Sequence, residues 1–385
     1  MTKKIIYFLF QPLTKFNYER FGIETLTAKG WDVECWVYLE KFHSNFGNKK
    51  KEYINEKNVY NFKTFFDCFK ELRRLPSNFY FVDSSSGSFL ANIMQRFMII
   101  KGGKRISLQR SLFPYVENTS IKFFLINKNL KSFIFFINKF FKIIYSLFNN
   151  KFIRPKANYV FTAGDIPYAI AKSKNNKAKV INAHSYDYET YLNLKNLPVN
   201  KNYLNSIVYI DQAYEANYEI KMNKLNLPTN EKFHWDSLNL FFDNLSKKLK
   251  KKIFIAPHHR RDKSAKINTH HEIISSGVGS LIKDCSLVVA HDSVAISFAI
   301  LFKKPIIFLT SDEINKTVFD ISIKKFASEL GVEPININQF QNFDAYDFLY
   351  FNQNAYQKWT DDYIKSPNSK TKSFWLDFDN YFEKN

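Results

Sequence analysis

Short apolar runs alternate with amphipathic stretches in the first half of the chain, a pattern typical of an α/β protein. Residues 4–10 and 32–38 read as strands, and residues 16–29 between them read as a helix that ends before Gly30. A strand, a helix and a second strand in this order form the start of a parallel sheet. The sequence therefore predicts a βαβ unit at the beginning of the chain.

Two later apolar runs, 79–82 and 159–162, each lead into a loop of small and acidic residues. The first loop begins at Asp83, and the second contains Gly164 and Asp165. Ligands of doubly wound sheets bind at loops that follow the carboxyl ends of parallel strands, although ordinary turns have the same composition. Both loops are therefore candidate binding loops.

The same alternation restarts near residue 203. Apolar runs that read as strands lie at 206–210, 252–256, 286–290 and 305–309. Helices are expected at 270–283 and 294–302. The tail from Asp344 reads as terminal helices. This is the pattern of a second α/β unit.

The composition is that of a globular protein, with 45% hydrophobic and 24% charged residues. A chain of 385 residues is too long for one core and suits two domains of ordinary size. We therefore predict an α/β protein with two Rossmann-like domains facing a cleft. Residues 1–195 would form the first domain, and residues 196–385, with the terminal helices, would form the second.

The three cysteines, Cys35, Cys68 and Cys285, form no CxxC pair. They indicate neither a disulfide framework nor a thiolate metal site. The first residues contain lysines and a short apolar run but no small-residue cleavage site. The sequence therefore favours a cytoplasmic location over secretion.

The formal net charge of +20 is distributed unevenly. Residues 101–160 hold twelve Lys or Arg against one acidic residue, Glu117, which gives this stretch a net charge of +11. Such a patch attracts anionic lipid or nucleic acid.

Four lysines of this stretch fall within about 80° of one another on a helical wheel. They are Lys128, Lys131, Lys139 and Lys142. No run reaches the roughly 20 apolar residues of a spanning helix. The segment 120–150 therefore reads as a basic amphipathic helix on an anionic membrane surface, at the inner face of the membrane. A core helix with a solvated lysine face is the alternative, and no nucleic-acid partner is expected.

The strand at 253–256 ends in Pro257, His258, His259, Arg260 and Arg261. Imidazole and guanidinium groups at a strand end can neutralise the phosphate of a nucleotide-sugar leaving group. We therefore predict that His258 acts in catalysis and that Arg260 binds the donor. Neighbouring side chains of an extended chain point apart, so we expect no metal ion and no other cofactor.

A second strand ends in His291, Asp292 and Ser293, and a helix is expected to begin at once. Asp292 or Ser293 would cap this helix, which also carries Ser297. A helix N-terminus offers free amides and the positive end of its dipole to a phosphate. We therefore predict donor-binding roles for Asp292, Ser293 and Ser297, with which simple capping is compatible.

Asp211 and Gln212 follow the strand at 206–210. A carboxylate there can act as a base toward the acceptor hydroxyl or as a nucleophile that forms a glycosyl intermediate. A turn-forming aspartate is the alternative. We predict that Asp211 is catalytic and that Gln212 contacts the donor.

His184 and Asp187 lie in a polar stretch near the expected domain junction. These residues suit contacts to an acceptor or a hinge, and an ordinary helix cap explains them equally well. Together with Asp165 they are the reserve candidates for an acceptor contact or for the base.

Four segments, HSYDYETYL, IVYIDQ, IAPHHR and HDSVAISFAILFKKPIIFL, occur in this order within residues 180–312. Together they resemble bacterial capsule and lipopolysaccharide glycosyltransferases of the sialyltransferase-like type, which transfer Kdo and nonulosonic acids. The resemblance implies the GT-B fold, with residues 1–195 binding the acceptor and residues 196–385 binding the donor. It also implies a CMP-activated keto-deoxy sugar acid as that donor.

By position, His258 resembles the histidine of the sialyltransferase His-Pro motif, and His259 stands where that motif has its proline. Ser293 and Ser297 resemble serines near the donor phosphate, and Asp211 resembles an acid of an FLDQ-like segment. The acid-acid-glycine motif of the first domain has no clean counterpart here.

The resemblance therefore implies a metal-independent, peripheral membrane glycosyltransferase that moves a sialic-acid-like sugar or Kdo from a CMP-sugar to a glycan or glycolipid. One alternative is a GT-B enzyme that uses a UDP or GDP sugar, either a transferase or an epimerase. The other is a non-catalytic basic protein that binds anionic lipid or nucleic acid.

Overall fold

The structure, a computed structural model, describes most of the chain. The described residues are 3–10, 13–38, 56–84, 89–111, 113–114, 153–217, 227–258, 261–262, 264–275, 277–340 and 343–382. The chain divides into two compact units. The first comprises Met1–Ser111, Asn129–Tyr186 and Asn368–Asn385, and the second comprises Leu112–Lys128 and Asp187–Pro367.

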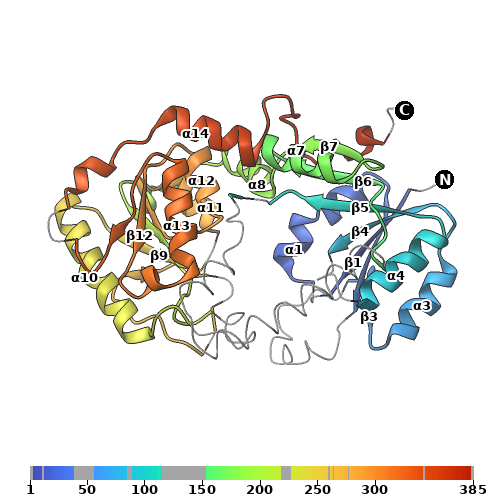
Figure 1. Ribbon diagram of the computed structural model, residues 1–385, viewed down its shortest axis with the longest axis horizontal. Coiled ribbons are helices and arrows are strands. Elements are labelled where there is room, and N and C mark those ends of the chain that lie inside the picture. The colour runs from blue at the N-terminus through green and yellow to red at the C-terminus, as the bar shows by residue number, and fades with distance from the viewer. Residues whose placement is uncertain are drawn as a thin grey trace. The chain divides into compact units, whose positions relative to one another are not determined.

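The first unit is built on a seven-stranded parallel sheet with the order β3-β2-β1-β4-β5-β6-β7 (Figure 1). Its strands are β1 (Lys4–Leu9), β2 (Asp32–Tyr38), β3 (Val59–Phe62), β4 (Phe79–Ser84), β5 (Gly103–Gln109), β6 (Tyr159–Ala163) and β7 (Lys179–Ala183). Its helices are α1 (Lys15–Arg20), α2 (Ile23–Ala28), α3 (Phe65–Arg74), α4 (Phe89–Ile100) and α7 (Asp165–Lys174).

Both faces of this sheet are covered. Successive residues of a strand point to opposite faces, so Tyr7 of β1 lies in one core and Ile6 and Phe8 lie in the other. Ile23 and Leu26 of α2 pack on the first face, whereas residues of α3 and α4 pack on the second. This is the layered architecture that buried parallel strands require.

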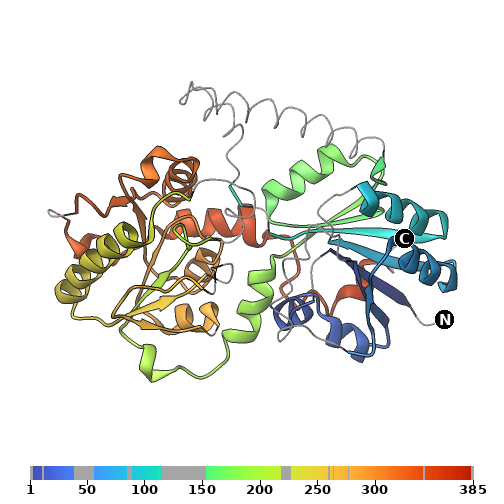
Figure 2. The ribbon, with the colours of Figure 1, turned by 90° about the horizontal axis from the view of Figure 1, so that it is seen from below.

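The end of the chain completes the core of the first unit. Phe374, Trp375 and Phe378 are buried in the core that also contains Tyr7. The indole nitrogen of Trp375 donates to the carbonyl of Arg20 at 3.1 Å. The first strand and the last helical turn therefore belong to the same unit (Figure 2).

The expected domains 1–195 and 196–385 differ from these units at the boundary, at the end of the chain and in residues 112–128, which belong to the second unit. The division falls between Tyr186 and Asp187, and residues 368–385 belong to the first unit. The physical reason for the second difference is the cluster of buried aromatic rings just described, which the sheet of the first unit needs to cover one face.

The second unit contains a six-stranded parallel sheet with the order β10-β9-β8-β11-β12-β13. Its strands are β8 (Ile207–Ile210), β9 (Ile253–Ala256), β10 (Glu272–Ile273), β11 (Leu287–Ala290), β12 (Ile306–Thr310) and β13 (Ile335–Asn336). Its helices are α8 (Tyr186–Leu194), which begins at the boundary, α10 (Glu231–Leu249), α11 (Val278–Asp284), α12 (Ile296–Leu301), α13 (Val318–Glu329) and α14 (Gln353–Trp359). Short helical turns lie at Lys201–Tyr203, Ile314–Lys316, Ala345–Phe348, Thr360–Ile364 and Phe378–Tyr381, the last of these in the first unit.

Helices again cover both faces of this second sheet. On one face, Trp235, Leu238 and Phe242 of α10 pack on alternate residues of the central strands. On the other face, residues of α11, α12, α13 and α14 pack on the remaining strand residues. Figure 1 shows α10 on one flank of the strands and α11, α12 and α13 on the other.

Two predicted helices differ from the observed elements. The helix expected at 16–29 is divided into α1 and α2, because Gly22 takes a left-handed conformation with φ 63°. The helix expected at 270–283 is replaced by the edge strand β10 followed by α11. Gly277, with φ 51°, starts α11 and separates it from β10.

Among the described helices, none is both long enough and apolar enough to cross a membrane. The predicted basic helix at 120–150, with Lys128, Lys131, Lys139 and Lys142, lies outside the described residues.

Candidate functional site

The strand order of the second unit identifies one place for a ligand. From β8 the chain moves outward to β9 and β10, and then returns to β11 on the other side of β8. At such a reversal, ligands of open parallel sheets bind beyond the carboxyl ends of the flanking strands, which here are β8 and β11. Asp211, His258 and His291 directly follow or lie near the ends of β8, β9 and β11. Three of the predicted segments therefore meet at this edge.

Asp211 is the centre of a buried polar network at this edge. Its side chain is 0% exposed. Its Oδ2 accepts hydrogen bonds from Nε and Nη2 of Arg261 at 3.0 and 2.9 Å. The same oxygen accepts from the backbone N–H of His258 at 3.2 Å, and Oδ1 accepts from the backbone N–H of Ala213 at 2.7 Å. Both carboxylate oxygens are therefore engaged in holding the two loops that follow β8 and β9.

Glu215 extends the network on the other side of Arg261. The buried Glu215 carboxylate lies 2.6 Å from Arg261 and accepts from the indole N–H of Trp235 at 2.7 Å. His234 Nε2 lies 3.8 Å from the second Glu215 oxygen. Burial lowers the pKa of His234 to about 4, so its ring is neutral at pH 7. The cluster thus contains two carboxylates and one guanidinium.

Arg261 supplies the positive charge of this cluster. Burial lowers its pKa, but the Asp211 and Glu215 carboxylates raise it by more, so the guanidinium remains charged. Asp211, Glu215 and His234 bring possible ligand atoms within 4.8 Å of one another, which is the spacing of a metal site. The guanidinium between the two carboxylates takes the role that a cation would have there, and these residues do not fit a metal ion.

The two loops are also joined through their backbones. The backbone N–H of Asp262 donates to the carbonyl of Ala216 at 2.9 Å, and Asn217 forms an isolated bridge with Arg261. Ala213 takes a left-handed conformation with φ 52°, which costs an alanine about 1 kcal/mol. The turn at 211–214 is therefore held in a specific and mildly strained form by its hydrogen bonds.

A second buried group follows β11. His291 is 0% exposed, its Nδ1 lies 2.7 Å from the carbonyl of Leu309, and its Nε2 lies 3.1 Å from the hydroxyl of Tyr209. Burial lowers the pKa of His291 to about 3, so it is neutral. The hydroxyl of Tyr214 donates to Asp292, whose pKa burial raises. Asp292 is therefore fixed by the loop that follows β8.

His258 is the predicted catalytic residue with the most accessible position. It is half-buried at the end of β9, its N–H is held by Asp211, and its carbonyl accepts from the N–H of Arg261 at 3.0 Å. Hydrogen bonds thus hold both the backbone N–H and the backbone carbonyl of His258. His259 and Arg260 lie outside the described residues, so the predicted donor contact of Arg260 stays a prediction.

The prediction that Asp292 or Ser293 caps the helix after β11 is wrong. The helix α12 begins only at Ile296, its N-cap residue is Ala295, and no side chain caps it. Ser293 instead accepts from the N–H of Ala295 at 3.3 Å, because a turn separates β11 from α12. Ser297 is 0% exposed, and its hydroxyl has no hydrogen-bond partner among the described residues. Gln212 is half-buried directly after β8.

The reserve candidates lie in different surroundings. His184 is buried in the first unit, where its Nε2 lies 3.0 Å from the carbonyl of Lys372 and Arg110 donates to its carbonyl at 2.7 Å. Asp187 lies in the first turn of α8, in the second unit. Asp165 is an exposed first-turn residue of α7, and Asn182 donates to it at 3.4 Å. The structure therefore places these residues in separate elements.

The other predicted binding loop begins with a buried ion pair. The Asp83 carboxylate is 0% exposed and lies 2.5 Å from Arg105 and 2.6 Å from Arg154. Most of the loop that follows, 85–88, lies outside the described residues. Asp83 is thus paired within the first unit.

Glu215 and His234, which complete the network, are not among the site residues predicted from the sequence. Glu215 lies four residues after Asp211, and His234 lies far along the chain on α10. Arg261 was noted only as a neighbour of His258. An acid, a second acid and an arginine at the ends of adjacent strands are a signal that could have suggested a buried ion pair.

No protein-family model matches the chain, and no curated protein matches it in sequence. Solved structures do match. The UDP-GlcNAc 2-epimerase from Methanocaldococcus jannaschii aligns over 100% of both chains with 13% identity and a TM-score of 0.52. A UDP co-structure of MnaA from S. aureus aligns over 99% of this chain and 97% of that chain, with 13% identity and a TM-score of 0.50.

The wall teichoic acid polymerase TagF aligns over 99% of this chain and 89% of that chain, with 12% identity and a TM-score of 0.51. The fold prediction is confirmed: two parallel-sheet, Rossmann-like units form the GT-B fold, which these enzymes share. At such low identity the likeness shows the fold, and activity needs an argument from the site.

Proposed function

We propose that this protein is a glycosyltransferase that takes its sugar from a UDP-activated donor bound at the carboxyl edge of the second unit's sheet. The observation that carries the proposal is the convergence of His258, Gln212 and Asp292 at the strand-order reversal of a GT-B fold. Support for a uridine nucleotide comes from the similar structures, two of which are named for UDP or a UDP sugar.

In the proposed reaction, the bond between the sugar's anomeric carbon and the UDP phosphate breaks, and a bond to the acceptor oxygen forms. The half-buried imidazole of His258 donates a hydrogen bond to the departing phosphate and stabilises its negative charge. The acceptor hydroxyl loses its proton to a base. Arg261 is sequestered by Asp211 and Glu215, so it acts on the site only through the loop it holds.

Asp211 takes a positioning role in this proposal. Its two oxygens already accept hydrogen bonds from Arg261, His258 and Ala213, and a general base needs an oxygen within reach of the proton it removes. The carboxylate therefore fixes the backbone of His258. The base would come from elsewhere, and Asp187 and Asp165 remain candidates.

A UDP-sugar 2-epimerase is the second candidate function, because an enzyme of that activity aligns over the full length of both chains. Epimerisation at a carbon must remove and return a proton there, so it requires an accessible base. At this edge the Asp211 and Glu215 carboxylates are engaged in ion pairs with Arg261, and the Tyr214 hydroxyl donates to Asp292. Transfer needs a base as well, so the products formed from a UDP sugar decide between the two functions.

The CMP-activated donor implied by the sequence resemblance is the rival reading of the same site. The acidic sugar belongs to this rival reading. The glycan or glycolipid acceptor and the contact with an anionic membrane, which depend on the resemblance and on the basic segment, are compatible with either donor. A UDP donor replaces the CMP donor here because uridine nucleotides are named for the similar structures.

The test is an assay of UDP release from a panel of UDP sugars, with a parallel assay for epimerised sugar. We expect UDP release without epimerisation, and a loss of about 100-fold in His258→Ala, because one leaving-group donor is removed. Asp236→Asn, an exposed change on α10, is the matched control and should keep normal turnover. Epimerised product without sugar transfer, or normal turnover in His258→Ala, would overturn the proposal.

A further inference from the structure

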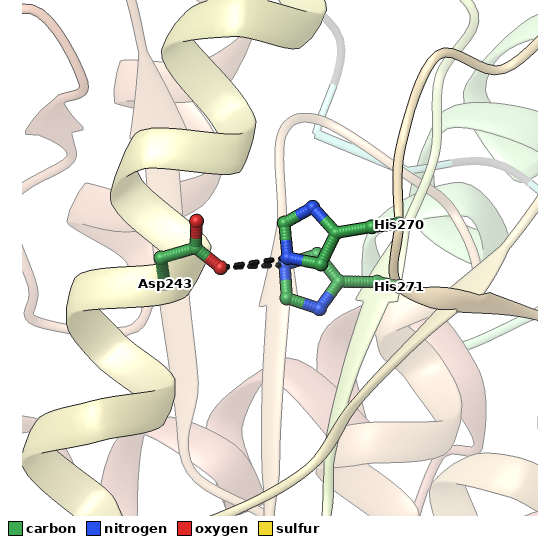
Figure 3. Close-up of side chains that lie close together, drawn as sticks. All are labelled: Asp243, His270 and His271. Carbon is green, nitrogen blue, oxygen red and sulfur yellow. Dashed lines mark hydrogen bonds and ion pairs between the residues drawn. The ribbon is translucent and has the colours of Figure 1, made fainter.

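We infer that Asp243, His270 and His271 form a binding site for a borderline divalent transition cation such as Zn²⁺. Asp243 lies on α10, and the two histidines lie in the loop that leads into β10. Figure 3 shows both imidazole rings directed at the same oxygen of Asp243. Possible ligand atoms of all three residues lie within 4.8 Å of one another.

The distances suit coordination. The Nε2 atoms of His270 and His271 lie 2.9 and 3.5 Å from Oδ1 of Asp243. Zinc binds such nitrogen and oxygen ligands at about 2.0–2.2 Å, so neighbouring ligand atoms lie roughly 3 Å apart. The donor set of two imidazoles and one carboxylate favours Zn²⁺, Co²⁺ or Ni²⁺ over Mg²⁺ and Ca²⁺, which prefer oxygen ligands.

Within the part of the chain that the structure describes, the contacts among the three side chains leave one possible ligand atom without a hydrogen-bond partner. His270 lies within hydrogen-bond distance of Oδ1 of Asp243, whereas the Nε2 of His271, 3.5 Å from the same oxygen, is buried with no hydrogen-bond partner among the described residues. A cation would satisfy the Nε2 atoms and the carboxylate together.

The loop is held in place before any cation binds. Asn239, one turn before Asp243 on α10, donates to the carbonyl of Asn268 at 2.9 Å and accepts from the hydroxyl of Thr269 at 2.6 Å. The N–H of His271 donates to that hydroxyl at 3.2 Å. The ring of His271 packs edge-on against Phe242. These contacts fix the histidines opposite Asp243, and such support is what a metal site requires.

The site is separate from the nucleotide-sugar site. Glu272 pairs with Phe254 in the parallel register, so His271 lies level with the first residue of β9. His258 lies two residues beyond the end of that strand at Ala256, roughly 16 Å further along at about 3.3 Å per residue. A cation here would link α10 to the edge strand β10, and its role would be to stabilise the second unit.

The experiment titrates the full-length protein, stripped with EDTA and dialysed, with Co²⁺ under visible absorption and with Zn²⁺ against a chromophoric chelator. We expect one strong Zn²⁺ equivalent and a Co²⁺ spectrum of nitrogen and oxygen ligation. His270→Gln and Asp243→Asn should each weaken binding by about 10- to 100-fold, at least the cost of losing an outer-shell partner. Both replaced side chains are more than half exposed, so these variants should fold.

Asp236→Asn is the matched control, because Asp236 is an exposed carboxylate on the same helix. It should bind Zn²⁺ as the unaltered protein does. Zinc should raise the unfolding temperature of the unaltered protein and of Asp236→Asn, but not of Asp243→Asn. Absence of a strong Zn²⁺ equivalent, or undiminished binding in both His270→Gln and Asp243→Asn, would overturn the proposal.

Discussion

At the residue scale, the clearest case is Asp211, whose position after a strand suggested a catalytic carboxylate. Buried carboxylates are stable only when paired and hydrogen-bonded, and Arg261 provides that pairing here. His258 has the opposite character, since its backbone is fixed while its side chain is half-buried. Our proposal therefore assigns the chemistry to His258 and a positioning role to Asp211.

A first prediction follows for Asp211. Asp211→Asn removes one partner of a buried ion pair, a change that typically costs about 3–5 kcal/mol. It should lower the free energy of unfolding by about 3 kcal/mol, because the amide oxygen can still accept a hydrogen bond from Arg261. Urea denaturation measures this, with Asp236→Asn as an exposed control expected to change it by less than about 0.5 kcal/mol. Unchanged stability with lost activity would instead mark Asp211 as a catalytic base.

A second prediction concerns pH. The pKa values of His234 and His291 are lowered by burial to about 4 and about 3, below their unfolded value. Below about pH 6.5 the unfolded chain therefore binds more protons than the folded chain, and the free energy of unfolding decreases as the pH decreases. Between pH 6.5 and pH 5 each histidine should contribute a loss of about 2 kcal/mol, at 1.36 kcal/mol per pH unit.

The measurement for this prediction is a series of urea denaturation curves between pH 7.5 and pH 5. His234→Phe, which keeps an aromatic ring beside Trp235, should remove about half of the pH dependence that the two histidines produce. A variant with the full slope of the unaltered protein would show that His234 is not neutral in the fold.

At the element scale, the return of the chain end to the first unit depends on a glycine. Gly22 divides α1 from α2 with φ 63°, and a Cβ built on it would lie 2.2 Å from the ring of Trp375. Gly30 has φ 84°, but a Cβ there would meet no atom within 4 Å. Both glycines thus have a left-handed backbone that would strain any other residue, but only Gly22 packs against Trp375 of the C-terminal segment.

The third prediction uses this pair. Gly30→Ala should cost about 1 kcal/mol through its left-handed backbone alone. Gly22→Ala should cost an additional 1 to 3 kcal/mol, roughly, because Trp375 must move from the core. Denaturation of both variants tests this, and equal costs would show that Trp375 does not pack against Gly22.

Element boundaries were the weakest part of the sequence prediction. The strands β1, β2, β4, β6, β8, β9, β11 and β12 were predicted because each is a short apolar run beside turn residues. The strands β3, β5, β7, β10 and β13 were not predicted. In β10, for example, the exposed Glu272 and Ile273 carry no apolar pattern. The start of α12 was misplaced because Asp292 and Ser293 are typical cap residues that here serve a turn.

At the scale of the whole molecule, alternating strands and helices were sufficient to predict two α/β units. The course of the last residues was not predictable, because aromatic residues such as Phe374 and Trp375 suit a helix on either unit. The site was predictable as far as strand ends, since loops there converge in any doubly wound sheet. Partners from distant elements, such as His234, were not, because pairing depends on packing.

The most direct measurement is a calorimetric titration of the full-length protein with UDP, CMP and GDP, in buffer with EDTA so that metal binding makes no contribution. The proposal predicts selective UDP binding to the unaltered protein, weakened at least about tenfold in His258→Ala through the lost phosphate contact and unchanged in Asp236→Asn. Tighter binding of CMP than of UDP would contradict the UDP donor and favour a CMP-sugar transferase, and no binding of any nucleotide would contradict a nucleotide-sugar enzyme.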